Sequence, residues 1–273
     1  MKRFIPILLS TLASARFDEA PDCRCRPHQD CWPSQEEWGA LNSSIHGNLV
    51  TVQPAAAVCY DPHSDTSACA TVTEQWSNLT WRAATPGTVQ WTNWEAWPEH
   101  DEYCYLQNPQ DKPCRQGRIS PYSALVESTH DIQKTVNFAK RHNLRLAVKN
   151  SGHDFLGRST APESLQILVN GMKDIDLVDD FVPTGASDDD GEGPAVTIAA
   201  GVSVQELYAA VAAKKRVAVG GAYHTIGVAG GYIQGGGHSP IGTWKGLASD
   251  NALEFQVITA NVVNLLSLCA NFS

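Results

Sequence analysis

The stretch Val148-Lys149-Asn150-Ser151-Gly152-His153-Asp154-Phe155-Leu156-Gly157-Arg158-Ser159 joins an apolar run to a short polar loop with two glycines. Such a loop can turn several backbone N–H groups toward one point and form a nest for an anion. Glycine within it lets the backbone approach a phosphate group closely. The alternative is an ordinary tight turn whose histidine has hydrogen-bond partners, and this short motif taken alone favours that alternative.

A second segment, GGAYHTIGVAGGYIQGGGHS at residues 220–239, lies between two predicted strands. Eight of its first eighteen residues are glycine, yet it is too apolar for a flexible linker. Ordered glycine-rich backbone usually means close approach to a ligand or to another part of the chain. The segment is neither a P-loop nor a dinucleotide motif within a βαβ unit. The alternative is a tightly packed structural turn.

Together the two segments resemble the FAD-linked oxidases of the vanillyl-alcohol-oxidase type, which have a PCMH-type FAD-binding domain. Within that type, the chain looks like secreted fungal members similar to berberine-bridge-enzyme-like and isoamyl-alcohol-oxidase-like proteins. The resemblance includes residues 247–254 and Cys31-Trp32-Pro33-Ser34, and so covers most of the chain to about residue 260. It implies an α+β class, with a PCMH-type FAD-binding fold preceded by a disulfide-rich, loop-rich N-terminal region.

The same resemblance implies the cofactor, FAD, and its site. The Ser-Gly-His loop would bind the FAD pyrophosphate, and His153 would be bonded covalently to the flavin 8α-methyl group. The glycine-rich loop at residues 227–239 would pass along the flavin. The cofactor-binding residues implied are Asn150, Ser151, Gly152, His153, Asp154, Gly157, Gly227, Gly230, Gly231, Gly235 and Gly236.

Two departures from the family pattern affect these expectations. Tyr223 stands where many bicovalent relatives have a second flavin-linking cysteine, so that bond is not available here. The family also continues for some two hundred residues or more, whereas residues 261–273 do not resemble its continuation. We therefore expect an incomplete FAD-binding domain at residues 121–273 that does not turn over substrate alone. No catalytic base is assigned, because in the family it comes largely from the missing part.

The function implied is that of a secreted FAD-dependent oxidoreductase. It would oxidise a small-molecule substrate, namely an alcohol, a sugar or a secondary metabolite, and pass electrons to molecular oxygen. The alternative is a non-catalytic secreted glycoprotein fragment whose Trp-rich surface binds a partner or a glycan. Colour separates the two, because only the first protein is yellow with a chromophore that stays in an acid precipitate.

The first residues have the anatomy of a secretory signal peptide, with a basic start, an apolar run and Ala13-Ser14-Ala15. We expect residues 1–15 to be removed; the alternative is a buried N-terminal strand. Three N-glycosylation sequons, at Asn42, Asn78 and Asn271, agree with export.

Seven of the eight cysteines lie in the first half of the chain, which on an exported protein indicates disulfides. No spacing of zinc ligands occurs, and we expect no metal site. Cys59 with Cys69 and Cys104 with Cys114 are plausible local pairs. One of Cys23, Cys25 and Cys31 would then be left over.

Composition excludes several classes of protein. The chain has 273 residues and a formal net charge of −9, which argues against a nucleic-acid partner. Hydrophobic residues make up 42% and charged residues 18%, as in a globular protein. No apolar run reaches the roughly 18 residues of a membrane-spanning helix, so no membrane partner is expected.

Local patterns divide the chain at about residue 120. Residues 16–120 are rich in Trp, Pro and Cys and suggest an irregular, disulfide-stapled cap. Beyond them, Ser128 or Thr129 can cap a helix with Ile132, Val136 and Ala139 on one face, ending near residue 142. A second helix is expected at 204–214, and a polar, acidic loop at 182–194. Strands are expected at residues 144–148, 166–170, 195–200 and 253–258.

Overall fold

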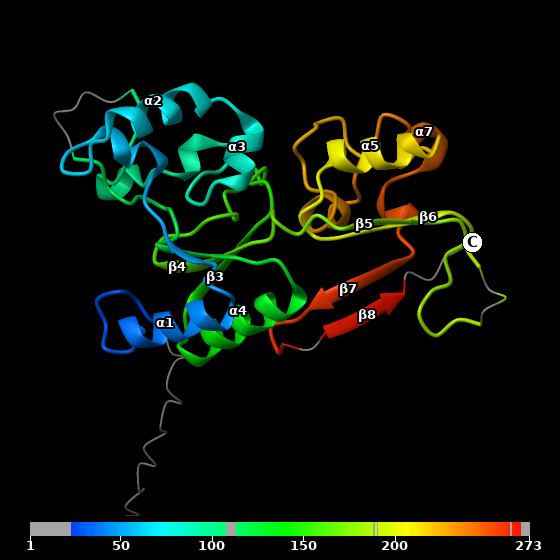
Figure 1. Ribbon diagram of the computed structural model, residues 1–273, viewed down its shortest axis with the longest axis horizontal. Helices are drawn as coiled ribbons and strands as arrows, with labels where there is room; N and C mark the ends of the chain where they lie inside the picture. The colour runs from blue at the N-terminus through cyan, green and yellow to red at the C-terminus, as the bar shows by residue number, and fades with distance from the viewer. Residues whose placement is uncertain (1–22, 108–112, 188, 190, 263, 269–273) are drawn as a thin grey trace, which may run out of the picture.

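The computed structural model describes residues 23–107, 113–187, 189, 191–262 and, for the backbone alone, 264–268 (Figure 1). The expected signal peptide at residues 1–15 lies outside the described residues. So do the sequon at Asn271, Cys269 and two aspartates, Asp188 and Asp190, of the acidic loop. Within the described part, residues 182–194 form neither helix nor strand, as expected.

A four-stranded sheet supports the 150–159 loop. Its order is β1 (Leu49–Thr51), β2 (Tyr122–Leu125), β4 (Ser164–Leu168) and β3 (Arg145–Lys149). Strands β2 and β3 both run parallel to β4, and β1 pairs antiparallel with β2 at the edge. Every residue of β4 is buried, which suits a central strand covered on both faces. The expected strands at 144–148 and 166–170 are thus confirmed within two residues.

Helix α4 (Thr129–Arg141) begins where the sequence predicts. The Ser128 hydroxyl accepts from the Asp131 N–H, and the Asp131 carboxylate accepts from the Ser128 N–H, which makes a capping box. In the view of Figure 1, α4 lies on one side of β3 and β4 together with α1 (Gln35–Ser44). The shared core is built by Trp38 of α1, which stacks on Tyr122 with 4.0 Å between ring centroids, and by Phe138 of α4.

The N-terminal region is more regular than the expected irregular cap. Besides α1 and β1 it contains α2 (Thr66–Gln75), α3 (Leu79–Ala84) and short 3-10 turns at Ala55–Cys59, Thr92–Trp94 and Pro98–His100. No residue of α2 is buried, so its sequence carries no apolar stripe that would reveal it. The boundary at residue 120 stays a prediction, and α1 and β1 share the core of the sheet beyond it.

Three disulfides hold this region. The expected pairs Cys59–Cys69 and Cys104–Cys114 are confirmed, and Cys25 pairs with Cys31. Cys23 is therefore the cysteine left over, with an exposed free thiol.

A second core follows in the chain. Strands β5 (Ile175–Val178) and β6 (Ala195–Ile198) pair antiparallel, and helix α5 (Val204–Ala213) packs on them through Leu207 and Val211. The remaining elements are α6 (Gly231–Gln234), α7 (Gly242–Lys245), a 3-10 turn at Ser249–Asn251, β7 (Glu254–Ile258) and β8 (Asn264–Leu268). The expected strands at 195–200 and 253–258 and the helix at 204–214 are confirmed. Among the described residues, no helix combines the length and apolar character that crossing a bilayer demands.

Candidate cofactor site

The loop at residues 150–158, called the histidine loop below, leaves the sheet at the carboxyl end of β3. Its first side chain, Asn150, donates from Nδ2 to the Ala200 carbonyl at 2.6 Å, which ties the loop to the turn before α5. Gly152 has φ +80°, a conformation that favours glycine, and a side chain there would make a tight contact of 3.1 Å with the Val89 Cα atom.

The structure brings the histidine loop against the glycine-rich segment. The Gly227 N–H donates to the Ser151 hydroxyl at 3.2 Å, and His153 Nε2 lies 2.7 Å from Thr225 Oγ1. A side chain on Gly227 would collide with the side chain of Asn150. Two segments about 75 residues apart in sequence therefore lie against each other in space.

His153 is uncharged at neutral pH. Burial, and secondarily the charge of His224, lower the pKa of His153 to about 4. Nε2 faces Thr225, a residue that is only 5% exposed. Nδ1, by contrast, has no hydrogen-bond partner among the described residues. The Tyr223 ring meets the imidazole edge-on at 5.3 Å. A neutral imidazole with one nitrogen held and the other free can act as a nucleophile.

Backbone amides gather on the same loop. The N–H groups of residues 151–155 have no hydrogen-bond acceptor within the part of the chain that the structure describes. The buried Asn150 Oδ1 atom likewise has no donor. Ser151 and Gly152 are buried whereas Phe155 is exposed, and successive backbone amides without a partner can form a nest for an anion or a polar ligand. These residues fit the phosphates of a dinucleotide.

Asp154 and Gly157 serve the shape of the loop itself. The Asp154 carboxylate accepts from the N–H groups of Leu156 and Arg158, at 3.1 and 2.8 Å, and pairs with the Arg158 guanidinium. Hydrogen bonding from Arg158 lowers the pKa of Asp154, which stays ionised. Gly157 has φ +74° and lies against the Trp94 ring.

The later glycines lie around α6. Gly230 precedes the helix with φ +82°, Gly231 begins it, and Gly235 and Gly236 follow its end. None of these four is hydrogen-bonded to the histidine loop among the described residues. Of the glycine-rich segment, residues 225 and 227 are hydrogen-bonded to that loop, and the Tyr223 ring contacts His153.

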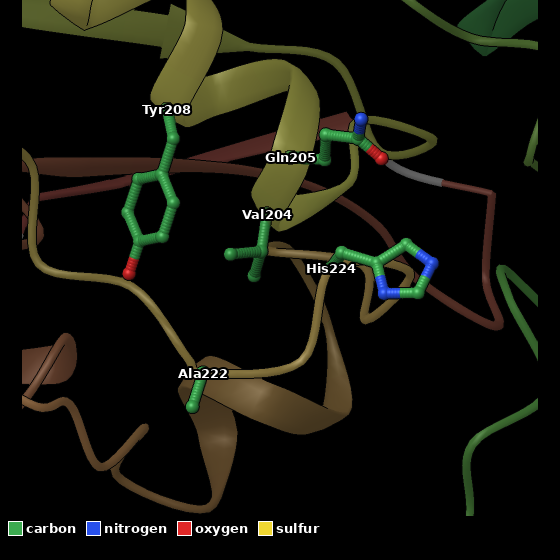
Figure 2. A pocket seen from close by; sticks show the side chains of 5 residues that line it. All are labelled: Val204, Gln205, Tyr208, Ala222 and His224. Atoms are coloured by element: carbon green, nitrogen blue, oxygen red, sulfur yellow. The ribbon is translucent and has the colours of Figure 1, made fainter.

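A shallow cavity of about 460 Å³ lies beside the site, and its lining was not predicted from the sequence. Figure 2 shows Val204, Gln205 and Tyr208 projecting from α5, with Ala222 and His224 on the facing loop. The Tyr208 hydroxyl donates to the Gly221 carbonyl at 3.0 Å and fixes this loop to the helix. In the described part of the chain no three His, Cys, Asp or Glu side chains group in a way that suits a metal ion.

Sequence reasoning missed three residues that contact the histidine loop: Gln90, Trp91 and Trp94. They lie in the Trp-rich run, whose composition signals aromatic packing but gives no partner. Thr225 lies within the glycine-rich segment and was not singled out either.

Known proteins share this architecture. The FAD binding domain family matches residues 121–262. An uncharacterized FAD-linked oxidoreductase of Arthroderma benhamiae is 53% identical over 94% of this chain, and the FAD-linked oxidoreductase easE of Epichloe festucae var. lolii is 47% identical over 96%. The crystal structure of the VAO-type flavoprotein MtVAO615 from Myceliophthora thermophila C1 superimposes with a TM-score of 0.81 and 32% identity over 90% of this chain. The chain spans 44% of the length of each of these three proteins.

Proposed function

Because the chain belongs to the FAD binding domain family, in its vanillyl-alcohol-oxidase type, we propose that it is the FAD-binding part of a secreted oxidoreductase and carries FAD bonded to His153. The observation that carries the proposal is the neutral His153 imidazole, held at Nε2 by Thr225 and free at Nδ1, beside unpaired loop amides. FAD is the cofactor of this domain, and when bound it accepts a hydride from the substrate.

Each part of the site then has a task. The amides of Ser151, Gly152 and their neighbours bind the pyrophosphate, because backbone N–H groups suit an anion. Thr225 orients the imidazole. His153 would bond the 8α-methyl carbon through its free ring nitrogen, with loss of its ring proton and of one methyl proton. The bound FAD would supply the acceptor for the two electrons released, with molecular oxygen as the final acceptor. Such a link would withdraw electron density from the ring and raise the reduction potential of the cofactor.

The substrate is proposed as a small alcohol, sugar or secondary metabolite, with molecular oxygen as electron acceptor. The relatives' names support oxidoreductase chemistry, and no residue of this chain is assigned as the catalytic base.

Secretion is part of the proposal. It is supported by the signal-like first fifteen residues and by three disulfides, which persist in oxidising compartments. Of the two sequons within the described residues, Asn78 is exposed at the N-terminus of α3.

The test is to express the full chain in a secreting host, precipitate the exported protein with acid and map flavin-bearing peptides. We expect a yellow pellet, an adduct on His153 and a mature N-terminus at Arg16. His153→Ala should release its flavin on acid treatment, whereas the matched variant His238→Ala should retain it. A colourless protein would favour the non-catalytic glycoprotein, and an adduct on His224 or His238 would refute the assignment.

A further inference from the structure

A segment of the Trp-rich region contacts the carbonyl groups of the histidine loop one after another. The Gln90 side chain donates from Nε2 to the Ser151 carbonyl at 2.9 Å, and the Gln90 N–H donates to the Gly152 carbonyl at 3.0 Å. The Trp91 indole N–H donates to the His153 carbonyl at 3.2 Å. Four residues on from Gln90, the Trp94 indole N–H donates to the Phe155 carbonyl at 3.1 Å.

These four donors fix which way the loop's peptide groups face. In a planar trans peptide, the C=O group and the N–H group of the next residue point in opposite directions. When the carbonyls of Ser151, Gly152 and His153 are held on one side, the N–H groups of residues 152–154 are turned to the other. Those are three of the amides that have no acceptor within the described part of the chain.

Buried charges hold residues 90–94, the segment that supplies these donors. Glu95, the next residue, accepts from the Val89 N–H at 2.8 Å and pairs with Arg82. Arg82 in turn donates to the Val89 carbonyl at 2.9 Å from Nε. Lys149, the residue before the histidine loop, is fully buried and donates to the Arg82 and Thr85 carbonyls, at 2.8 Å each.

We propose that Gln90, Trp91 and Trp94 form a carbonyl clamp, which holds the histidine loop in the conformation that presents its amides to the pyrophosphate of FAD. The inference rests on the proposed function, since it assigns the clamp a role in loading that cofactor. The three residues are positioning residues, because they contact the carbonyls of the loop and act on FAD only through the loop's conformation. The Trp-rich region thereby serves the cofactor site rather than an independent glycan or partner.

The arginine of the histidine loop supports a site in which backbone amides, not a cationic side chain, bind the phosphates. Arg158 is committed to Asp154, so its charge is already paired. Recognition of the phosphates therefore depends on how accurately the peptide groups are oriented, and it should be sensitive to losing even neutral donors on the far side of the loop.

The experiment compares the double variant Trp91→Phe/Trp94→Phe with Trp97→Phe in the full chain. Phenylalanine keeps an aromatic ring but lacks the indole N–H. Trp97 is in the same region and has no indole bond to the loop among the described residues. The measurements are the dissociation constant of FAD, the fraction of chain with acid-stable flavin and the protection of the 150–157 peptide from hydrogen exchange on adding FAD.

We expect the double variant to bind FAD roughly tenfold more weakly, equivalent to about 1.4 kcal/mol. It should also lose most FAD-induced protection of residues 150–157, while Trp97→Phe resembles the wild type in both. Melting temperatures of the apo-proteins control for folding. If the double variant melts below Trp97→Phe, the single variants Trp91→Phe and Trp94→Phe decide by the same measurements.

Two results would overturn the inference, and they differ. In the first, the wild type takes up FAD and the double variant binds it as tightly as Trp97→Phe does. This result refutes the carbonyl clamp and leaves the proposed function standing. Wild-type protein that takes up no FAD removes the proposed function, and the clamp's role with it.

Discussion

His153 and Thr225 are joined by a contact of 2.7 Å between Nε2 and Oγ1, although 72 residues separate them in sequence. The contact unites the loop after β3 with the glycine-rich segment. It also fixes which ring nitrogen is occupied, because Nδ1 has no partner among the described residues.

Thr225→Val should impair covalent attachment of FAD. Valine keeps the shape of threonine but offers no hydrogen-bonding oxygen, so the imidazole loses its orientation and a buried nitrogen loses its partner. A net loss of about 1.4 kcal/mol corresponds to a tenfold slower attachment. The measurement is the rate at which acid-stable flavin forms on apo-protein.

Thr225→Ser is the matched control, since it keeps the hydroxyl and should attach FAD at nearly the wild-type rate. Equal rates in the valine and serine variants would show that the hydroxyl does not orient His153.

The lowered pKa of His153 predicts that attachment tolerates mild acid. With a pKa of about 4, roughly nine-tenths of His153 is neutral at pH 5, against about 3% of a histidine with the ordinary pKa of 6.5. The attachment rate should therefore change less than about twofold between pH 7.5 and pH 5 and fall below about pH 4.5. A fall that begins near pH 6.5 would contradict this.

The same group affects folding stability. Between about pH 4 and pH 6.5 the unfolded chain takes up a proton at His153 more readily than the folded chain does. Protonation of His153 in the unfolded chain therefore lowers the free energy of unfolding as the pH falls through that range. His153→Gln should remove that part of the pH dependence in urea unfolding of the apo-protein.

Helices and disulfides that are marked by nearby residues could be predicted from the sequence. Ser128 followed by Ile132, Val136 and Ala139 located α4, because a cap and an apolar stripe are both readable within one helix. The ten-residue spacing of two cysteine pairs likewise indicated their disulfides. The two glycine-containing loops pointed to the family, and through it to FAD as the cofactor, by their resemblance to known sequences.

Contacts between distant segments left no such signal. Trp91 donates to the carbonyl of a residue 62 positions away, and nothing in a Trp-rich run names that partner. The edge strand β1 has three residues and is recognised only by its pairing with β2. The short helix α6 was hidden because glycine, which begins it, has low helix propensity.

The buried charges behind the carbonyl clamp give a prediction about stability. Glu95→Gln leaves the buried Arg82 and Lys149 without their carboxylate and should lower the free energy of unfolding by about 3–5 kcal/mol. Lys149→Met removes one of the buried cations instead and should cost less. Urea unfolding at pH 7 measures both, and a Lys149→Met cost as large as that of Glu95→Gln would contradict the argument.

Lys149 also links stability to pH. Burial lowers the pKa of Lys149 to about 7, despite the opposing effect of Glu95. Above pH 7 the unfolded chain still holds the proton that the folded chain has lost, so this contribution to stability rises with pH toward 10.5. The wild type should gain stability between pH 7 and pH 9, and Lys149→Met should gain less.

Gly227→Ala should separate the two loops of the cofactor site. A methyl group at residue 227 would occupy the place of the Asn150 side chain, which is held by its bond to the Ala200 carbonyl. Asn150 must move, and the contact of the Gly227 N–H with the Ser151 hydroxyl is strained with it. Overpacking of this kind costs about 1–3 kcal/mol, so FAD uptake should fall roughly five- to a hundredfold.

Gly242→Ala is the matched control, because residue 242 lies outside the glycine-rich segment. A side chain at residue 242 meets no atom within 4 Å, and alanine favours the helix α7 that begins there. This variant should take up FAD like the wild type and melt at the same temperature or slightly higher. Titration of both apo-proteins with FAD, read by flavin fluorescence, compares them directly. If Gly227→Ala bound FAD as tightly as Gly242→Ala, the close fit of Gly227 to Asn150 would have no part in holding the cofactor.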